Sequence, residues 1–235
     1  MKKALILAAG MGSRLREAHS SPKPLTLLHG ETSLLRLLRQ FESNSIRETA
    51  IVTGYRSEEI RSFVAENYHG AMKITWFDNQ RYKEPNGVSL LSAGSFVTER
   101  ILLSMADHVF LGDAVPVMCQ QSADSDHSLL LIDRNLGEIF DMDDATKVLT
   151  DAHGAILDIG KEIPEYNAVD TGLFCITPSL VEALSRLESP TLSEGVKLLA
   201  SRGLMGTVEL TGGTWQDIDT PETLAHALTL LDQEK

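Results

Sequence analysis

Strand-like and helix-like segments alternate along residues 3–110, and this alternation constrains the fold more than any other feature. Short apolar runs, typical of strands buried on both faces, occupy residues 3–9, 48–55, 72–79 and 100–110. Segments with helical spacing or helix-start signals lie between them, at residues 33–43, 57–68 and 87–97. Such repetition needs right-handed crossovers. We therefore predict an α/β fold with a Rossmann-like, mostly parallel twisted sheet and helices on both faces.

The pattern changes after about residue 127. Residues 145–163 form two strand-like runs joined by a turn at 151–154, which predicts a β-hairpin rather than another crossover. The remaining predicted elements are strands at 171–177 and 206–212 and helices at 178–189, 191–203 and 221–234. No linker or repeat divides the chain, so we expect one domain at 1–235, with crossover units in about 1–127 and a mixed β-hairpin region in about 128–235.

Composition excludes several classes of partner. The 21 Lys and Arg residues are outnumbered by 33 Asp and Glu residues, and the formal charge of −12 argues against nucleic acid as a partner. No apolar run approaches the roughly 20 residues of a membrane span. The two cysteines, Cys119 and Cys175, lack a metal-type spacing and fit a reduced, cytoplasmic setting.

A glycine-rich turn follows the first predicted strand, in the stretch LAAGMGSRL at residues 7–15. Such a turn presents backbone N–H groups that suit phosphate oxygens. Arg14 adds a planar guanidinium, and Lys23, held between two prolines in SPKPL, adds a compact positive charge. A solvated turn would explain Gly-x-Gly alone, but the nearby Lys23 makes a phosphate site the better hypothesis. The loop is not a dinucleotide fingerprint, because Leu15 replaces the third glycine, and it is not a Walker A loop, because Gly-Lys-Ser/Thr is absent.

These two stretches resemble the signature of nucleotidyltransferases that join an NTP to a phosphorylated alcohol or sugar and release pyrophosphate. The similarity runs nearly end to end and is strongest to cytidylyltransferases acting on inositol 1-phosphate and on phosphocholine. Further matching motifs are NGVSLL (86–91), MADHVF (105–110), ATKV (145–148), IGKEI (159–163), AVDTGLF (168–174) and WQDIDT (215–220). The resemblance implies Mg²⁺-dependent transfer of CMP from CTP to a phosphorylated alcohol, foremost inositol 1-phosphate, with release of pyrophosphate.

The resemblance also implies a nucleotide site in the first half of the chain. Arg14 and Lys23 would be the catalytic cations that hold the triphosphate. Asn79 and Ser89 are explained nearly as well by a polar turn and a helix cap. The choice of cytosine rests on the resemblance alone. The expected nucleotide-binding residues are Leu7, Ala8, Ala9, Gly10, Gly12, Ser13, Arg14, Lys23, Asn79, Asn86, Gly87, Ser89 and Asp107.

Three aspartates are the expected Mg²⁺ ligands. Asp107 follows an apolar run, at the carboxyl end of a predicted central strand, where open parallel sheets bind their ligands. It could instead cap the following turn, and the resemblance of its motif favours the metal role. Asp217 and Asp219 are two residues apart, so both would face one side of an extended segment. The resemblance favours Asp217. Asp219 has an alternative role as a cap of the helix that begins near Pro221.

The acceptor substrate is expected to bind the second half. Its phosphate must approach an anionic triphosphate, so positive charge is needed there. The resemblance assigns this charge to Lys147 and Lys161, on the two strands of the predicted hairpin, which without it would be read as solvated lysines of a strand face. Asp170 would accept hydrogen bonds from substrate hydroxyls. Glu138 and Asp144 lie nearby in the sequence without an assigned role. The expected acceptor-binding residues are His108, Lys147, Lys161, Asp170 and Gly172.

Other functions stay open at this point. The alternative acceptors are phosphocholine, 2-aminoethylphosphonate and a sugar 1-phosphate. A quaternary ammonium favours an aromatic cage, which the low aromatic content disfavours, although Trp215, Tyr166 and Phe174 keep choline open. A non-catalytic nucleotide-sensing subunit is a further alternative, but such a protein would be expected to lose a metal carboxylate or the loop lysine. The oligomeric state also stays open, and a homodimer is one option.

Overall fold

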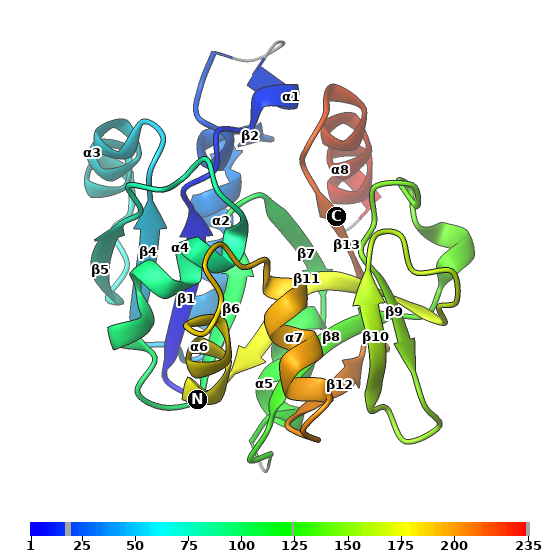
Figure 1. Ribbon diagram of the computed structural model, residues 1–235. Coiled ribbons are helices and arrows are strands. Elements are labelled where there is room, and N and C mark those ends of the chain that lie inside the picture. The colour runs from blue at the N-terminus through cyan, green and yellow to red at the C-terminus, as the bar shows by residue number, and fades with distance from the viewer. Residues whose placement is uncertain (17–19, 124, 234–235) are drawn as a thin grey trace.

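A mixed sheet between two layers of helices forms the body of the computed structural model (Figure 1). The structure describes residues 1–16, 20–123 and 125–233. The strands of the sheet are β1 (Lys3–Ala8), β4 (Glu48–Thr53), β5 (Lys73–Asp78), β6 (Ile101–Met105), β8 (Ser128–Asp133), β9 (Lys147–Thr150), β10 (Ile156–Gly160), β11 (Ala168–Ile176) and β12 (Met205–Glu209). Their order is β10-β9-β11-β6-β1-β4-β5, and β8 pairs with β11 and β12.

The strand directions explain why the two halves of the sequence look different. Strands β6, β1, β4 and β5 are parallel neighbours, which agrees with the predicted crossover units. Strand β11 runs antiparallel to β6, β8 and β9, and β9 and β10 form the predicted hairpin. The predicted Rossmann-like α/β fold with a hairpin region in the second half is therefore confirmed.

Helices cover both faces of the sheet, as their apolar stripes require. Helices α2 (Ser33–Ser43), α3 (Ser57–Asn67) and α5 (Ala114–Gln121) pack on one face. Helices α4 (Asn86–Ser92), α6 (Pro178–Leu184) and α7 (Leu192–Ala200) pack on the other. In α2, the side chain of Thr32 caps the helix by accepting a hydrogen bond from the Leu35 N–H. Among the described residues, no helix has the length and apolar character needed to cross a bilayer.

The predicted strand at 100–110 is wrong as a single element. It is two strands, β6 and β7 (His108–Gly112), separated by a turn at Ala106 and Asp107. Strand β7 leaves the main sheet and pairs antiparallel with β13 (Gly213–Asp217). The turn could not be predicted from the sequence, because apolar residues continue on both sides of it. Its consequence is that Asp107 lies between two sheets, next to the end of β13.

Several smaller elements also differ from the predictions. Predicted helix 87–97 is α4 followed by the 3₁₀ turn η2 (Gly94–Phe96), and both α5 and β8 were not predicted. The final helix, α8 (Pro221–Gln233), packs on β7 in a small separate core, and the predicted last residue, Glu234, lies outside the described residues. The remaining elements are α1 (Ser13–Arg16), η1 (Lys23–Leu25), β2 (Leu27–Leu28), β3 (Glu31–Thr32) and η3 (Leu136–Glu138).

Candidate active site

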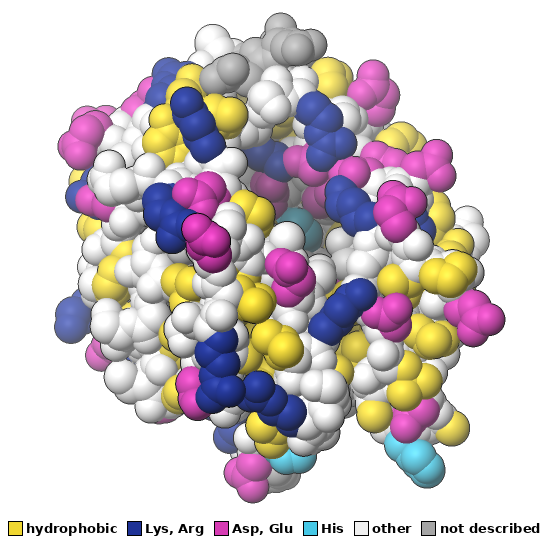
Figure 2. Space-filling view, viewed as in Figure 1, with side chains coloured by type: hydrophobic (Ala, Val, Ile, Leu, Met, Phe, Trp, Pro, Cys, Tyr) yellow, Lys and Arg dark blue, Asp and Glu magenta, His cyan; other side chains and the backbone are white. Residues whose placement is uncertain are grey.

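A cavity of about 230 Å³ opens at the carboxyl end of β6, bounded by the β9–β10 hairpin region and by β13. Figure 2 shows this face hollowed, with basic and acidic side chains gathered around the opening. Seven carboxylate side chains line the cavity, and aromatic rings from Phe140, Phe174 and Trp215 complete the wall. The carboxylates are those of Asp133, Glu138, Asp141, Asp144, Asp170, Asp217 and Asp219.

Lys23 is the central cation of this region. Its Nζ forms ion pairs with Asp107 and Asp219, and its side chain is only 12% exposed. Burial alone would lower the pKa of Lys23, but the charges of Asp107 and Asp219 outweigh burial and raise that pKa. Burial would likewise raise the pKa of Asp107, but Lys23 and His108 hold it well below its usual value. Lys23 and Asp107 are therefore both charged at neutral pH.

The glycine loop packs directly on Lys23. Gly12 has φ of +56°, and a Cβ atom there would lie 2.7 Å from the Lys23 Cβ. A side chain at position 12 would thus meet both backbone strain and a clash close to the lysine main chain. The loop and the lysine, which the sequence places in one phosphate site, are in contact.

Replacing Gly12 is expected to destabilise the protein more than replacing a matched glycine. Gly203 also has positive φ, at +69°, but a Cβ there would meet nothing within 4 Å. Left-handed backbone costs an L-residue about 1–2 kcal/mol, so Gly203→Ala reports this strain alone. Gly12→Ala adds the displacement of Lys23. Urea unfolding of both variants measures the difference, and equal losses would show that Gly12 does not restrain Lys23.

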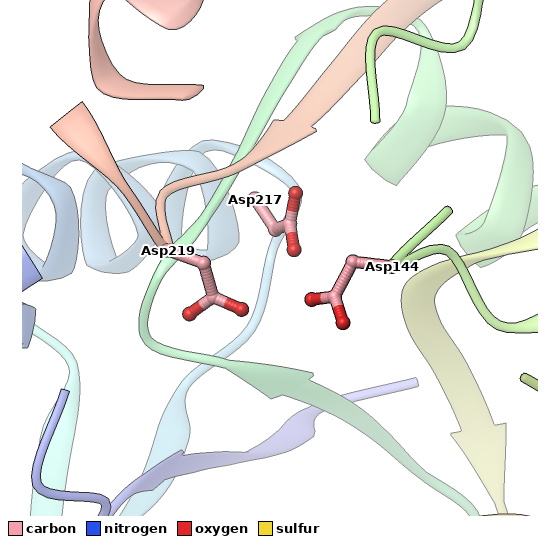
Figure 3. Close-up of side chains that lie close together, drawn as sticks. All are labelled: Asp144, Asp217 and Asp219. Carbon is pink, nitrogen blue, oxygen red and sulfur yellow. The ribbon is translucent and has the colours of Figure 1, made fainter. Parts of the chain in front are cut away.

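Three carboxylates point toward one another beside Lys23 (Figure 3). One oxygen from each of Asp144, Asp217 and Asp219 lies within 4.8 Å of the others. The β7–β13 pairing positions two of them, because it places Asp217 opposite His108 and lets Ile218 N–H donate to the Asp107 carbonyl at 3.0 Å. Asp144 lies in the loop before β9.

Nearby cations neutralise the carboxylates of this cluster only in part. Arg14 donates to Asp144 at 2.9 Å and to Asp219 at 2.7 Å, and Lys161 pairs with Asp144. Burial and the nearby charges of Asp219 and Asp107 raise the pKa of Asp217. A divalent cation would relieve this excess of negative charge, and carboxylate oxygens are the ligands that Mg²⁺ prefers. The donor set therefore fits the expected metal.

The cluster includes only part of the metal set expected from the sequence. Asp217 and Asp219 belong to it, whereas Asp107 is outside this group of described residues and instead accepts a hydrogen bond from His108 Nδ1 at 2.8 Å. Asp144, which had no assigned role, takes the third position. Asp219 does not use its carboxylate as a helix cap, because the Thr220 and Thr223 side chains close the first turn of α8.

Four of the five expected acceptor-binding residues line the cavity: His108, Lys161, Asp170 and Gly172. Lys147 is not among the described lining residues, and its Nζ lies 3.4 Å from the Asp143 carbonyl. Gly172 has φ of +78°, and a Cβ there would overlap the His108 ring. Its N–H donates to Asp170 at 2.7 Å, and burial raises the pKa of Asp170 to about 6.

The residues expected near the base have partners within the protein. Asn79 and Ser89 are buried, and Asn79 Nδ2 donates to Ser89 Oγ at 2.9 Å. Asn86 accepts a hydrogen bond from the Leu192 N–H at 2.9 Å, although Asn86 also lines the cavity. Gly87 lies against the Pro190 carbonyl. These contacts agree with the alternative role of this segment as a polar turn.

Part of the backbone near the end of β1 also has hydrogen-bond partners within the protein. The Leu7 carbonyl accepts from the Ala106 N–H at 3.0 Å, and the Ala9 carbonyl accepts from the Tyr55 N–H at 3.1 Å. Ala8 is buried in β1. Gly10 and Ser13 are exposed beside the loop. The exposed part of the expected nucleotide site therefore includes the loop from residue 10 onward and Asn86.

The structure also brings together residues that no pattern in the sequence connects. Trp215 stacks on His108 with ring centroids 6.2 Å apart, and Trp215 Nε1 donates to Asp133 at 3.1 Å. Phe140 stacks on His226 of α8 at 4.2 Å. Asp144 had a weak signal, since it lies in an acidic run directly before a predicted strand. Phe140 and His226 had none, because their pairing depends on tertiary structure.

Comparisons with known proteins agree with the fold. The solved structure of the inositol-1-phosphate CTP transferase from T. maritima superposes on the whole chain with a TM-score of 0.84, covering 96% of that protein at 23% identity. The bifunctional IPC transferase and DIPP synthase of Rubrobacter xylanophilus is 32% identical over 230 residues, which are 94% of this chain and 50% of that protein. The UTP–glucose-1-phosphate uridylyltransferase of Haloferax volcanii is 27% identical, covering 98% of this chain and 97% of that protein.

The family assignment follows from these matches. The chain spans about half the length of the bifunctional relatives that it matches. The family model of the MobA-like NTP transferase domain matches residues 4–199. The resemblance seen in the sequence is thus confirmed: the chain belongs to the MobA-like NTP transferase family and is a nucleotidyltransferase.

Proposed function

We propose that this nucleotidyltransferase transfers CMP from CTP to inositol 1-phosphate, with Mg²⁺ as cofactor, and releases pyrophosphate. The observation that carries the proposal is the contact of the Gly12 loop with Lys23, which pairs with Asp219 of a carboxylate-lined cavity. The names of the bifunctional relatives and of the T. maritima structure support the choice of substrates. Residues of about 1–127 would hold the nucleotide, and residues of about 128–235 would hold most of the acceptor.

The reaction is a direct displacement at phosphorus. An oxygen of the acceptor phosphate forms a bond to the α-phosphorus of CTP, the bond from that phosphorus to the bridging oxygen breaks, and the electron pair leaves with pyrophosphate. Arg14 and Lys23 would hold the triphosphate, exchanging their contacts with Asp144, Asp219 and Asp107 for phosphate oxygens. The work of the site is positioning and charge neutralisation.

The cation site would be formed by Asp217 and Asp219, with Asp144 or Asp107 as a further ligand. When bound, Mg²⁺ supplies positive charge that neutralises the phosphate oxygens. His108 need not act as a base, because a phosphate monoester is already ionised near neutral pH. The hydrogen bond of His108 to Asp107 and its stacking on Trp215 would instead hold these two side chains in place. Free Cys119 and Cys175 fit the cytoplasmic setting that we propose for this reaction.

The cavity wall favours a polyol acceptor. Ionised carboxylates accept hydrogen bonds from hydroxyl groups, and Asp170 lines the cavity beside His108. A cationic acceptor such as phosphocholine or an aminoalkyl phosphonate is the second candidate, because the seven lining carboxylates would attract its nitrogen. The rings are not arranged as a cage, since Trp215 stacks on His108 and Phe140 stacks on His226, so each presents at most one open face.

A substrate panel tests the proposal. Pyrophosphate release is measured with each of four NTPs against inositol 1-phosphate, phosphocholine, 2-aminoethylphosphonate and glucose 1-phosphate, with and without Mg²⁺. We expect Mg²⁺-dependent release with CTP and inositol 1-phosphate to exceed every other pair. A preference for a cationic acceptor would support the second candidate. Nucleotide binding without release from any pair would instead support a sensing subunit.

Asp170 gives the site a defined pH dependence. Because burial raises its pKa to about 6 from 3.8, its contribution to stability is full below about pH 4 and is lost as pH rises through 6. Asp170→Asn keeps an oxygen for the Gly172 N–H and removes the charge. We expect the variant to be more stable than wild type by about 1–3 kcal/mol at pH 8 and equally stable at pH 4, measured by urea unfolding. A variant that is less stable at pH 8 would contradict this assignment.

A further inference from the structure

A chain of hydrogen bonds runs from α8 to Asp217. Nδ1 of His226 lies 2.8 Å from Oε1 of Gln216. Nε2 of Gln216 donates to Oδ1 and to the main-chain oxygen of Asp217, each at 2.9 Å. Gln216 is only 5% exposed, so water competes little for these bonds. Asp217 is thus held by a buried amide that is itself held by a histidine.

The chemistry of these atoms fixes which one carries each hydrogen. A main-chain carbonyl only accepts hydrogen bonds, so the amide nitrogen of Gln216 must face the Asp217 carbonyl. A flipped amide would place its oxygen against this carbonyl oxygen. Oε1 of Gln216 therefore faces His226, and Nδ1 of His226 must donate to it. Burial also lowers the pKa of His226, so the neutral ring is the Nδ1–H tautomer.

The same histidine contacts the loop that carries Asp144. The ring of Phe140 stacks on His226 with centroids 4.2 Å apart and an angle of 11° between the planes. Phe140 is 50% exposed, and it lies between η3 and Asp144 in the loop before β9. His226 therefore joins the segment of Asp217 to the segment of Asp144, and these are two of the three clustered carboxylates.

We propose that His226, Gln216 and Phe140 are positioning residues that set the orientation of Asp217 and the place of the Asp144 loop for divalent-cation binding. This inference rests on the proposed function only for the presence of a cation at the cluster. Partners that orient ligating groups typically change metal affinity by about 10–100-fold when they are removed.

The tautomer of His226 tests the hydrogen-bond chain without any metal, substrate or variant. The ¹⁵N spectrum of the wild-type protein with labelled histidine is recorded at pH 8. We expect the shifts of His226 to show a protonated Nδ1 and an unprotonated Nε2. A neutral ring protonated at Nε2 would mean that the Gln216 amide faces the other way and would overturn the proposal. This outcome is independent of whether the enzyme transfers CMP.

Binding of Mn²⁺, followed by electron paramagnetic resonance of the free ion, tests the positioning role. His226→Phe keeps a ring beside Phe140 and removes the donor, Gln216→Leu removes the amide, and Phe140→Leu removes the stack. We expect the Mn²⁺ dissociation constant to rise about 10-fold or more in the first two and less in the third. At saturating Mn²⁺, kcat of His226→Phe should return toward the wild-type value, because His226 is not among the described residues that line the cavity.

A matched control separates this effect from a general loss of histidine. His153→Phe makes the same change at an exposed position in the turn between β9 and β10 and should leave Mn²⁺ binding unchanged. A folded His226→Phe protein that binds Mn²⁺ within about twofold of wild type would overturn the positioning role. A wild-type protein that binds no Mn²⁺ would instead overturn the cation part of the proposed function, and the role that depends on it.

Discussion

Replacing Lys23 with alanine is expected to lower kcat/KM for CTP by about 10²–10³-fold, because one positioned donor to a developing negative charge contributes on this scale. The geometry supports a large effect. Lys23 is nearly buried and is restrained by Gly12. It lies between Asp107 and Asp219 and pairs with both. Steady-state kinetics of pyrophosphate release with CTP and inositol 1-phosphate measure the loss.

The matched control is Lys73→Ala, which removes an exposed lysine from the edge strand β5 and should leave the kinetics unchanged. Because removing one partner of a buried ion pair destabilises a protein, thermal unfolding of Lys23→Ala must be followed alongside the kinetics. A folded Lys23→Ala enzyme that retains activity within about threefold of wild type would exclude Lys23 from the triphosphate site.

Replacing Asp217 with asparagine is expected to have a comparable effect through the cation. Lewis-acid stabilisation amounts to several kcal/mol and each 1.36 kcal/mol is tenfold in rate, so we expect kcat to fall at least about 10²-fold. The Mg²⁺ concentration for half-maximal rate should rise as well. Asp217 and Asp219 are common to the metal set expected from the sequence and to the cluster in the structure. Asp219 also pairs with Arg14 and Lys23, so Asp217→Asn tests the cation site with less effect on those ion pairs.

Two further variants decide which carboxylate completes the site. Asp107→Asn and Asp144→Asn are compared in the same Mg²⁺ titration. The one that shifts the Mg²⁺ requirement is the additional ligand. Asp143→Asn, next to Asp144 in the same loop but exposed, is the control. If Asp217→Asn shows the Mg²⁺ dependence of wild type, the cluster does not hold the catalytic cation.

The parts of the site that are local in the sequence could be predicted from it. Gly12, Arg14 and Lys23 occupy one short stretch, so their residue types alone indicate phosphate binding. The pair of Asp217 and Asp219 was likewise visible, because two residues of an extended segment share a side. The crossover units of the sheet were predicted for a similar reason, since periodicity is a local property.

The rest depends on contacts between distant segments. Asp144 joins the site through Arg14, which is 130 residues away in the sequence. The turn at Asp107 is hidden in a continuous apolar run, and only the pairing of β7 with β13 shows why the chain breaks there. Asn79 and Ser89 are polar residues whose partner is each other, so residue type could not separate a ligand contact from an internal one.

The central claim is that the Gly12 loop and Lys23 receive the triphosphate beside the aspartate cluster. A crystal structure with bound CTP tests it most directly. We predict that the triphosphate lies between the backbone of Gly12 and Lys23, with Lys23 Nζ moved from Asp219 to a phosphate oxygen. A triphosphate bound elsewhere, with Lys23 still paired to both Asp107 and Asp219, would contradict the account.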